Sequence, residues 1–512
     1  MNSKTVVFIH GWSVTNTDTY GELPRRLKLY AEQSGIDLRI EEIFLSKYIS
    51  FRDEVQIKDI SRAFDAAVED QLSGLLKKGE RFICITHSTG GPVIRDWLHR
   101  YFFNICPFEA IISKKREKCP LSHLIMLAPA NHGSALAQLG KGRLSRIKTW
   151  FEGVEPGEGV LNWLELGSSE AFDLNMRWIV AGKENIKEFK IFPFVLTGQC
   201  IDRKLYDNLN AYTGELGSDG VVRIASANLN GLYVRMIQNK PKEVRKGVFA
   251  AKELSILPIK NAPLSAMRVI SGKSHSGKDI GIMRSVKLSS EDNNSTELLK
   301  SIVSCLKVQS NDEYESLCKR FEEETVSVQK LEMLETIDGL FSFRRHFIHD
   351  RYTMVIFRIT DSENNPVTDF DLMLTAGEDS DPNKLPQGFF ADRQLNKISK
   401  NIVTFYLNYD IMAGTDEVKA NSGKIIRDRL PGAQALGFRI NARPDDGFVR
   451  YLPCEAKATP AMLQQVLRPN ATTLIDVVLQ RVVYKNVFRM EKLTDVTKTE
   501  SFRKAKPGEE VV

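Results

Sequence analysis

The sequence predicts an α/β protein with a mostly parallel sheet covered by helices, followed by a smaller C-terminal domain like a β-sandwich. Over the first 290 residues, short apolar runs alternate with segments whose apolar residues recur at helical spacing. From Arg351 onward the period changes to two, and turn residues separate short strands. The 512 residues suffice for about two to four domains, and 42% hydrophobic with 27% charged residues is typical of globular proteins.

Strands of the first part are expected where apolar runs are short, at residues 5–9, 38–43, 81–86, 123–127 and 192–197. Helical spacing of apolar residues is clearest over 57–76 and 92–101. Strands that alternate with helices in this way form a parallel sheet with helices on both faces.

These changes of pattern divide the chain into four parts. We expect a catalytic domain over 1–290, a helical connector over 291–350, a β-rich accessory domain over 351–500 and a tail over 501–512. The catalytic domain contains a long insertion at about 136–190 that is rich in tryptophan and glycine. Such an insertion is either a lid over a binding pocket or a cap that packs on the sheet. If it is a lid, Trp150 and Trp163 are candidates for contact with substrate.

Composition excludes several function classes. The net charge of +6 is spread over the whole chain and does not indicate nucleic-acid binding. The seven cysteines form no CxxC pair, so we expect no structural zinc site, and the acidic stretch after Arg351 has no ordered spacing of calcium ligands. The N-terminus lacks the apolar stretch of a Sec-type signal peptide. We therefore expect a protein that is cytoplasmic as synthesised, with leaderless export left open.

The strongest chemical motif is a strand, tight turn and helix over 82–92, with Ser88 at the apex. A nucleophile in this position stands clear of the sheet on a strained turn, and small residues on both sides let strand and helix pass closely. Gly90 is the second small residue, whereas Thr86 stands where the usual pattern has glycine. The turn places the backbone N–H of Thr89 at a helix N-terminus, where it can stabilise an oxyanion.

The acid and base candidates follow Ser88 along the chain. Asp219 lies in Gly217-Ser218-Asp219-Gly220, a turn before two valines, and Asp202 and Asp207 are fallback candidates. Among eight histidines, His275 alone follows both Ser88 and an acid candidate in a loop at the end of the α/β part. A carboxylate that orients an imidazole beside a serine is the arrangement of a serine hydrolase.

These motifs resemble the α/β-hydrolases of the lipase type, which share the order nucleophile, acid, base. The similarity is greatest to lipases grouped with the GPI inositol-deacylases and to bacterial triacylglycerol lipases. It rests on segments 8–12, 87–91, 128–134 and 218–222 and covers a little over half the chain. Antibacterial lipases delivered by type VI secretion offer a further parallel. The resemblance implies that Trp12 donates the second oxyanion N–H and that His10, Gly11 and His87 line the substrate site.

We therefore expect a serine-dependent lipase or phospholipase that cleaves lipid esters through an acyl-enzyme and needs no cofactor. The alternatives are an esterase, thioesterase or amidase for small soluble substrates, and a catalytically silent hydrolase fold that serves as a binding scaffold. Peripheral membrane contact is expected as well, with the β-rich domain docking the enzyme on a membrane or a partner.

Overall fold

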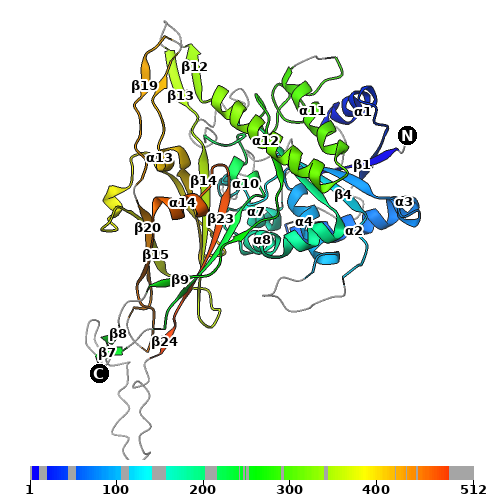
Figure 1. Ribbon diagram of the computed structural model, residues 1–512. Helices are drawn as coiled ribbons and strands as arrows, with labels where there is room; N and C mark the ends of the chain where they lie inside the picture. Colours follow the sequence, from blue (N-terminus) through cyan, green and yellow to red (C-terminus); the bar gives the residue numbers. More distant parts are fainter. Residues whose placement is uncertain are drawn as a thin grey trace, which may run out of the picture.

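The computed structural model describes residues 3–10, 20–43, 53–104, 115–140, 157–201, 216–240, 243–245, 248–249, 253–289, 293–338, 344–420, 422–433, 435–445 and 448–483. Figure 1 shows an α/β part on one side and an elongated β-rich part on the other. Within the described ranges, no helix is both long and apolar enough to cross a membrane.

The α/β part is built on a six-stranded parallel sheet in the order β11-β5-β4-β3-β1-β2. Its strands are β1 (Lys4–His10), β2 (Leu38–Ile43), β3 (Phe82–His87), β4 (Leu121–Leu127), β5 (Phe192–Thr197) and β11 (Ala266–Val269). Successive side chains point to opposite faces, so Val7 and Ile9 enter one core while Val6 and Phe8 enter the other. The sheet is therefore buried on both sides, as the near-continuous apolar runs predicted.

Helices cover both faces of this sheet. One face carries α2 (Ile57–Gln71), α3 (Ser73–Lys77), α4 (Gly90–Tyr101), α7 (Glu158–Leu164) and α8 (Ser169–Phe189). The opposite face carries α1 (Leu23–Gln33), α11 (Asn293–Lys307) and α12 (Asn311–Leu331). The short helices α5 (Ala137–Gly140) and α10 (Ile224–Ala227) lie in loops between the larger elements.

The segment expected to be a solvated connector is instead part of the α/β core. Leu299 and Ile302 of α11 and Leu317 and Phe321 of α12 are buried against the parallel sheet. Helix α12 packs closely on the edge strand β11. Charged residues on the outer face of α12 dominate its composition, so the sequence predicts a solvated helix although a narrow apolar stripe faces the sheet.

The β-rich part contains a second, mixed sheet of seven strands in the order β10-β6-β23-β14-β17-β16, with β9 paired to β6. These strands are β6 (Leu232–Gln238), β9 (Leu254–Ile256), β10 (Lys260–Asn261), β14 (Tyr352–Asp361), β16 (Phe390–Leu395), β17 (Ile402–Asn408) and β23 (Thr472–Leu479). A three-stranded sheet of β15 (Phe370–Ala376), β20 (Leu436–Ala442) and β22 (Cys454–Ala458) shares a hydrophobic core with it. This pair of sheets is the expected sandwich-like architecture.

Smaller elements complete the β-rich part. Four two-stranded pairs are β7 (Glu243–Arg245) with β8 (Val248–Phe249), β12 (Leu334–Asp338) with β13 (Arg344–Ile348), β18 (Val418–Lys419) with β19 (Ile425–Arg427), and β21 (Val449–Arg450) with β24 (Val482–Val483). The helices are α13 (Tyr409–Ala413), α14 (Pro460–Val466) and the 3₁₀ helix η4 (Pro382–Lys384).

The expected boundary near residue 290 does not separate the two parts. Strands β6, β9 and β10 precede residue 290, yet all three belong to the seven-stranded sheet. Strand β6 pairs in parallel with β23, a strand more than 230 residues further along the chain. Apolar periodicity identifies a strand but not the sheet that it joins. The sequence therefore could not show that β6, β9 and β10 belong to the seven-stranded sheet.

Helix α8 lies between the two large sheets and contributes to both cores. Its residues Leu174 and Trp178 pack in the α/β core, whereas Phe172 and Met176 pack against the seven-stranded sheet. Trp163 of α7 is also a core residue and is only 3% exposed. Insertion 136–190 was expected to be either a lid or a packed cap. The described residues 157–189 fit the packed cap, because their apolar side chains face two sheets.

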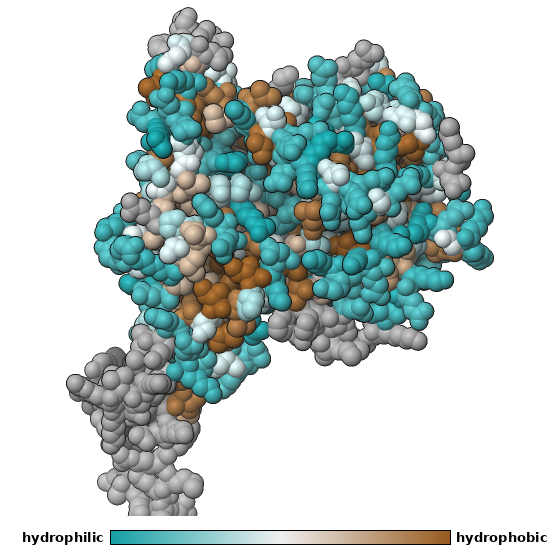
Figure 2. All heavy atoms as spheres, viewed as in Figure 1, coloured by the Kyte–Doolittle hydropathy of each residue, from teal (hydrophilic) through white to brown (hydrophobic). Residues whose placement is uncertain are grey.

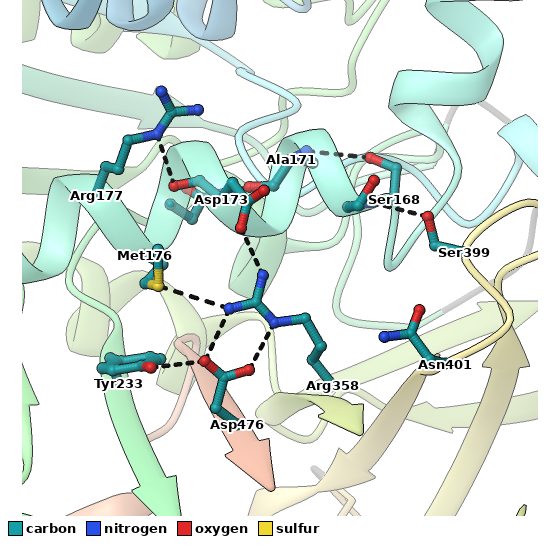
Figure 3. A network of polar contacts seen from close by, with 12 residues as sticks. Ser168, Ala171, Asp173, Met176, Arg177, Tyr233, Arg358, Ser399, Asn401 and Asp476 are labelled. Carbon is teal, nitrogen blue, oxygen red and sulfur yellow. Dashed lines mark hydrogen bonds and ion pairs between the residues drawn. The ribbon is translucent and has the colours of Figure 1, made fainter. Parts of the chain in front are cut away.

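A polar network fastens α8 to the second sheet (Figure 3). The guanidinium of Arg358, on β14, lies between Asp173 of α8, with Nη1 to Oδ1 at 2.5 Å, and Asp476 of β23, with Nε to Oδ1 at 2.6 Å. Tyr233 Oη donates to Asp476 Oδ2 at 2.6 Å. Although burial lowers the pKa of Arg358, the two carboxylates raise it above its ordinary value. The charge of Arg358 is thus compensated across the contact between the two parts.

Replacing Arg358 by methionine should lower the free energy of unfolding by about 3 kcal/mol, because it leaves the buried Asp476 carboxylate without its cation. Urea denaturation followed by circular dichroism measures this change. Arg443→Met is the matched control, since its ion pairs with Asp369 and Asp371 are exposed to solvent and should contribute little to the free energy of unfolding. Equal losses in the two variants would contradict a stabilising role for the contact.

Candidate active site

Ser88 lies on a sharp turn between β3 and α4. Its φ of +52° is a left-handed conformation that a non-glycine residue adopts only under constraint. Two backbone bonds join the turn to β4 and the loop after it: Ser88 N donates to Leu127 O at 3.1 Å, and Ala130 N donates to Ser88 O at 3.2 Å. The close packing around the turn requires Gly91, whose Cβ would lie 2.9 Å from Pro129 Cβ. These contacts give the strained turn that the sequence predicted.

Ser88, His275 and Asp219 form one continuous hydrogen-bonded chain. Ser88 Oγ is 3.2 Å from His275 Nε2, and His275 Nδ1 is 2.9 Å from Asp219 Oδ2. All three residues are buried, with Asp219 and His275 almost completely inaccessible. If Nδ1 carries the proton, it donates to the carboxylate and leaves Nε2 to accept the serine proton.

The carboxylate of Asp219 is fixed by its own loop. Its Oδ1 accepts from the backbone N–H groups of Val221 at 3.0 Å and Val222 at 2.7 Å, which leaves Oδ2 for the imidazole. An asparagine in this position would point its amide oxygen at the two N–H groups and its NH₂ group at His275. The imidazole would then have to accept at Nδ1 and carry its proton at Nε2, where it could not take the serine proton.

The loop that carries His275 is held from both sides. His275 N donates to Asp219 O at 2.9 Å, so both the backbone and the side chain of His275 bond to Asp219. Behind this contact, the ammonium of the buried Lys273 donates to Ser285 Oγ at 2.7 Å and to Ser295 Oγ at 3.0 Å, which ties the loop to α11. The approach of Gly198 to the Lys273 carbonyl leaves no room for a Cβ.

The other predicted site residues fall into three groups. Thr89 is the N-cap of α4 directly after Ser88, and His10 ends β1 opposite His87. The ring of His87 lies 4.7 Å from that of His275, and its Nε2 donates to the His275 carbonyl at 3.2 Å, so His87 contacts His275 directly. Trp163 lies in the core, and the remaining candidates lie outside the described residues, namely Gly11, Trp12, Trp150, Asp202 and Asp207.

Comparison with solved structures gives two matches over nearly the whole chain. Phospholipase PlaB from Legionella pneumophila is 42% identical, with a TM-score of 0.81 and 97% of each chain covered. PlaB from the same organism in complex with thio-NAD is 40% identical, with a TM-score of 0.80 and 98% of each chain covered. The chain belongs to the PlaB phospholipase family. No family model and no curated protein matches.

Membership of the PlaB family confirms the expected lipase-type α/β-hydrolase and extends the relationship beyond the catalytic half. The resemblance seen in the sequence covered a little over half the chain, whereas the PlaB match includes the β-rich part. In the PlaB family, therefore, the two parts occur together as one architecture.

A buried arginine on the helix that follows the Ser88 turn was not identified by the sequence analysis. Arg95 of α4 donates to Asn131 Oδ1 at 3.2 Å and to Asn175 Oδ1 at 2.9 Å, and its guanidinium lies 4.8 Å from the centre of the Trp178 ring. Burial lowers its pKa to about 9, so it remains charged at neutral pH. The network links α4, the loop after β4 and α8. An arginine on the apolar face of the segment expected to be helical was the available signal.

His132, in the loop after β4, stays neutral within this PlaB-type core. Burial lowers its pKa to about 3, and the charge of Arg95 acts in the same direction. Its backbone N–H donates to Ser226 O at 3.1 Å, which ties the loop to α10.

The buried His132 should make the fold sensitive to acid. Below about pH 6.5 the unfolded chain binds a proton on this residue that the folded chain does not, so stability falls between about pH 6.5 and pH 3, by up to about 1.4 kcal/mol per pH unit. His132→Asn should show a shallower decline in urea titrations at pH 6.5, 5.5 and 4.5. His346→Asn, on the hairpin of β12 and β13, is the control. An unchanged slope in His132→Asn would contradict the assignment.

Proposed function

We propose that this PlaB-family protein is a serine phospholipase that hydrolyses carboxylic esters of phospholipids through an acyl-enzyme. The observation that carries the proposal is the hydrogen-bonded chain Ser88–His275–Asp219 on a strained strand-to-helix turn. Membership of a phospholipase family supplies the substrate class. The intact geometry of the three residues argues against a silent scaffold, which has no need of an oriented imidazole.

The first half of the reaction transfers the acyl group to the enzyme. Ser88 Oγ attacks the ester carbonyl carbon while His275 Nε2 accepts the serine proton. Asp219 holds the imidazole in the productive tautomer and stabilises the imidazolium that forms. When the tetrahedral intermediate collapses, the bond to the leaving alcohol breaks and His275 returns the proton to that oxygen.

The oxyanion of the tetrahedral intermediate needs hydrogen-bond donors that are already in place. The backbone N–H of Thr89, at the start of α4, and that of Trp12, after β1, are the proposed donors. Each such donor contributes roughly 3 kcal/mol to stabilisation of the transition state. Their proposed sites follow the carboxyl ends of β3 and β1, which are neighbours in the sheet.

The second half regenerates the serine. A water molecule attacks the acyl carbonyl, His275 removes its proton, and the bond to Ser88 Oγ breaks with return of the proton to the serine. The products are a fatty acid and a lysophospholipid. All the proton transfers use residues of this chain, and none of the steps requires a cofactor.

Contact with a lipid surface is part of the proposal. Figure 2 shows an apolar area on the β-rich part, and Ile256 of β9 and Met462 of α14 are 44% and 40% exposed. Both line an apolar cavity of about 140 Å³ between the two sheets of the sandwich. Exposed apolar area of this kind supports peripheral binding to a membrane surface.

Ser88→Ala should abolish both fluorophosphonate labelling and fatty-acid release from mixed phospholipid vesicles, with a loss of roughly 10⁴-fold or more, because no other group replaces the nucleophile. Ser316→Ala, an exposed serine on α12, is the matched control and should retain full activity. The rate should also rise steeply when a short-chain phospholipid passes its aggregation threshold.

Other outcomes would revise the proposal in defined ways. Labelling without release of fatty acid, or smooth saturation through the aggregation threshold, would favour an esterase or thioesterase for soluble substrates. Retained labelling and hydrolysis in Ser88→Ala would contradict the serine mechanism itself.

A further inference from the structure

The loop that carries Asp219, residues 216–223 and here called the acid loop, is contacted by side chains from outside the α/β part. Tyr406, on β17 of the seven-stranded sheet, places its Oη 3.0 Å from Leu216 O and 3.1 Å from Gly217 O. The approach is close, because a Cβ on Gly217 would lie 2.4 Å from that hydroxyl and 2.7 Å from Tyr352 Cδ2. The φ of Gly217 is +73°, so the backbone conformation also favours glycine. The start of the acid loop is thus fitted to a tyrosine from another sheet.

The same tyrosine ring holds the other end of the loop. The buried guanidinium of Arg223 lies 4.1 Å from the centre of the Tyr406 ring, and its Nη2 bonds Asp392 Oδ2 at 2.5 Å. Asp392, on β16, is the cross-strand partner of Tyr406. A second contact fixes the Tyr406 ring, since Tyr352 stacks on it with centroids 4.6 Å apart and planes at 15°.

Between the two ends that contact Tyr406, the acid loop is short, and backbone hydrogen bonds connect its residues to one another. Ile224 N donates to Gly217 O at 2.9 Å and Asp219 N donates to Val222 O at 3.1 Å. A displacement of residues 216, 217 or 223 therefore moves the Asp219 carboxylate, which has to stay within hydrogen-bond reach of His275. A misplacement of about 1 Å can reduce turnover by roughly 100-fold.

We propose that Tyr406 is a positioning residue for the acid of the catalytic triad, so that the β-rich part completes the active site rather than only docking it. Tyr406 acts on the reaction through the acid loop and touches none of the reacting atoms. Arg223 and Asp392 are its supports. This inference rests on the proposed serine mechanism and assigns a role within it to a residue that lies 187 positions after Asp219.

The test compares two buried tyrosines of the same sheet. Tyr406→Phe should lower kcat about 10-fold and Tyr406→Leu about 100-fold, with KM changed less than about twofold, on phospholipid vesicles. Tyr233→Phe also removes a buried tyrosine hydroxyl bond, but that hydroxyl bonds Asp476 and not the backbone of the acid loop, so kcat should change less than about twofold. Wild-type kcat in folded Tyr406→Phe would overturn the proposal.

A double-mutant comparison separates positioning from general damage. In an Asp219→Asn background, Tyr406→Leu should lower the rate of fluorophosphonate labelling by no more than about twofold, because the group it positions is already gone. A further 100-fold loss would show that Tyr406 acts by another route and would overturn the inference. Wild-type activity of Asp219→Asn alone would instead refute the triad, so the two failures are distinguishable. If Tyr406→Leu does not fold, Tyr406→Phe in the same background replaces it.

Discussion

The path of the chain between Asp219 and His275 is the constraint on which the rest of the structure depends. After Asp219 the chain leaves the parallel sheet, forms β6, β9 and β10 within the second sheet, and returns as the edge strand β11 just before His275. The two residues that must meet at 2.9 Å are therefore separated by strands that belong elsewhere. Correct placement of the acid and base depends on how those strands are anchored.

The anchoring is distributed over several contacts of different kinds. Helix α8 provides the apolar layer between the sheets, Arg358 compensates Asp173 and Asp476 across the same contact, and Tyr406 holds the acid loop. A chain that ended near residue 290 would leave β6 without its partner β23 and would remove Tyr406 at the same time. The β-rich part is therefore better described as a component of the catalytic unit than as an appended module. Membrane contact, if the apolar area around β9 provides it, is a second role of the same structure.

The sequence predicted the local features well because they depend on short-range chemistry. Strands β2 and β5 have the bounds that were expected, and the turn at Ser88 has the positive φ that a nucleophile elbow requires. Chain order and loop context were sufficient to select Asp219 and His275, which the structure brings together with Ser88. The roles of these residues remain the proposal made above, while their proximity is a property of the fold.

The features that the sequence did not predict share a different cause. They depend on contacts between segments that are far apart in the chain. Tyr406 occupies one of two aromatic positions on the apolar strand β17, and nothing in its neighbours indicates a partner near residue 217. Helices α11 and α12 have charged outer faces, so their sequences resemble a connector until the sheet they cover is known. The tryptophans of 157–189 fit either a lid or a core, and only the presence of a second sheet decides between them.

Native-state hydrogen exchange across a series of urea concentrations is the most direct test of the claim that both sheets form one catalytic unit. The amides of β3, of residues 216–223 and of β17 should converge on a single cooperative opening with one free energy and one dependence on urea. Independent opening of β17 and β23 at lower urea, with β3 and the acid loop still protected, would contradict the claim. In that case the β-rich part would be a separable domain, and its contact with the acid loop would not hold the site together.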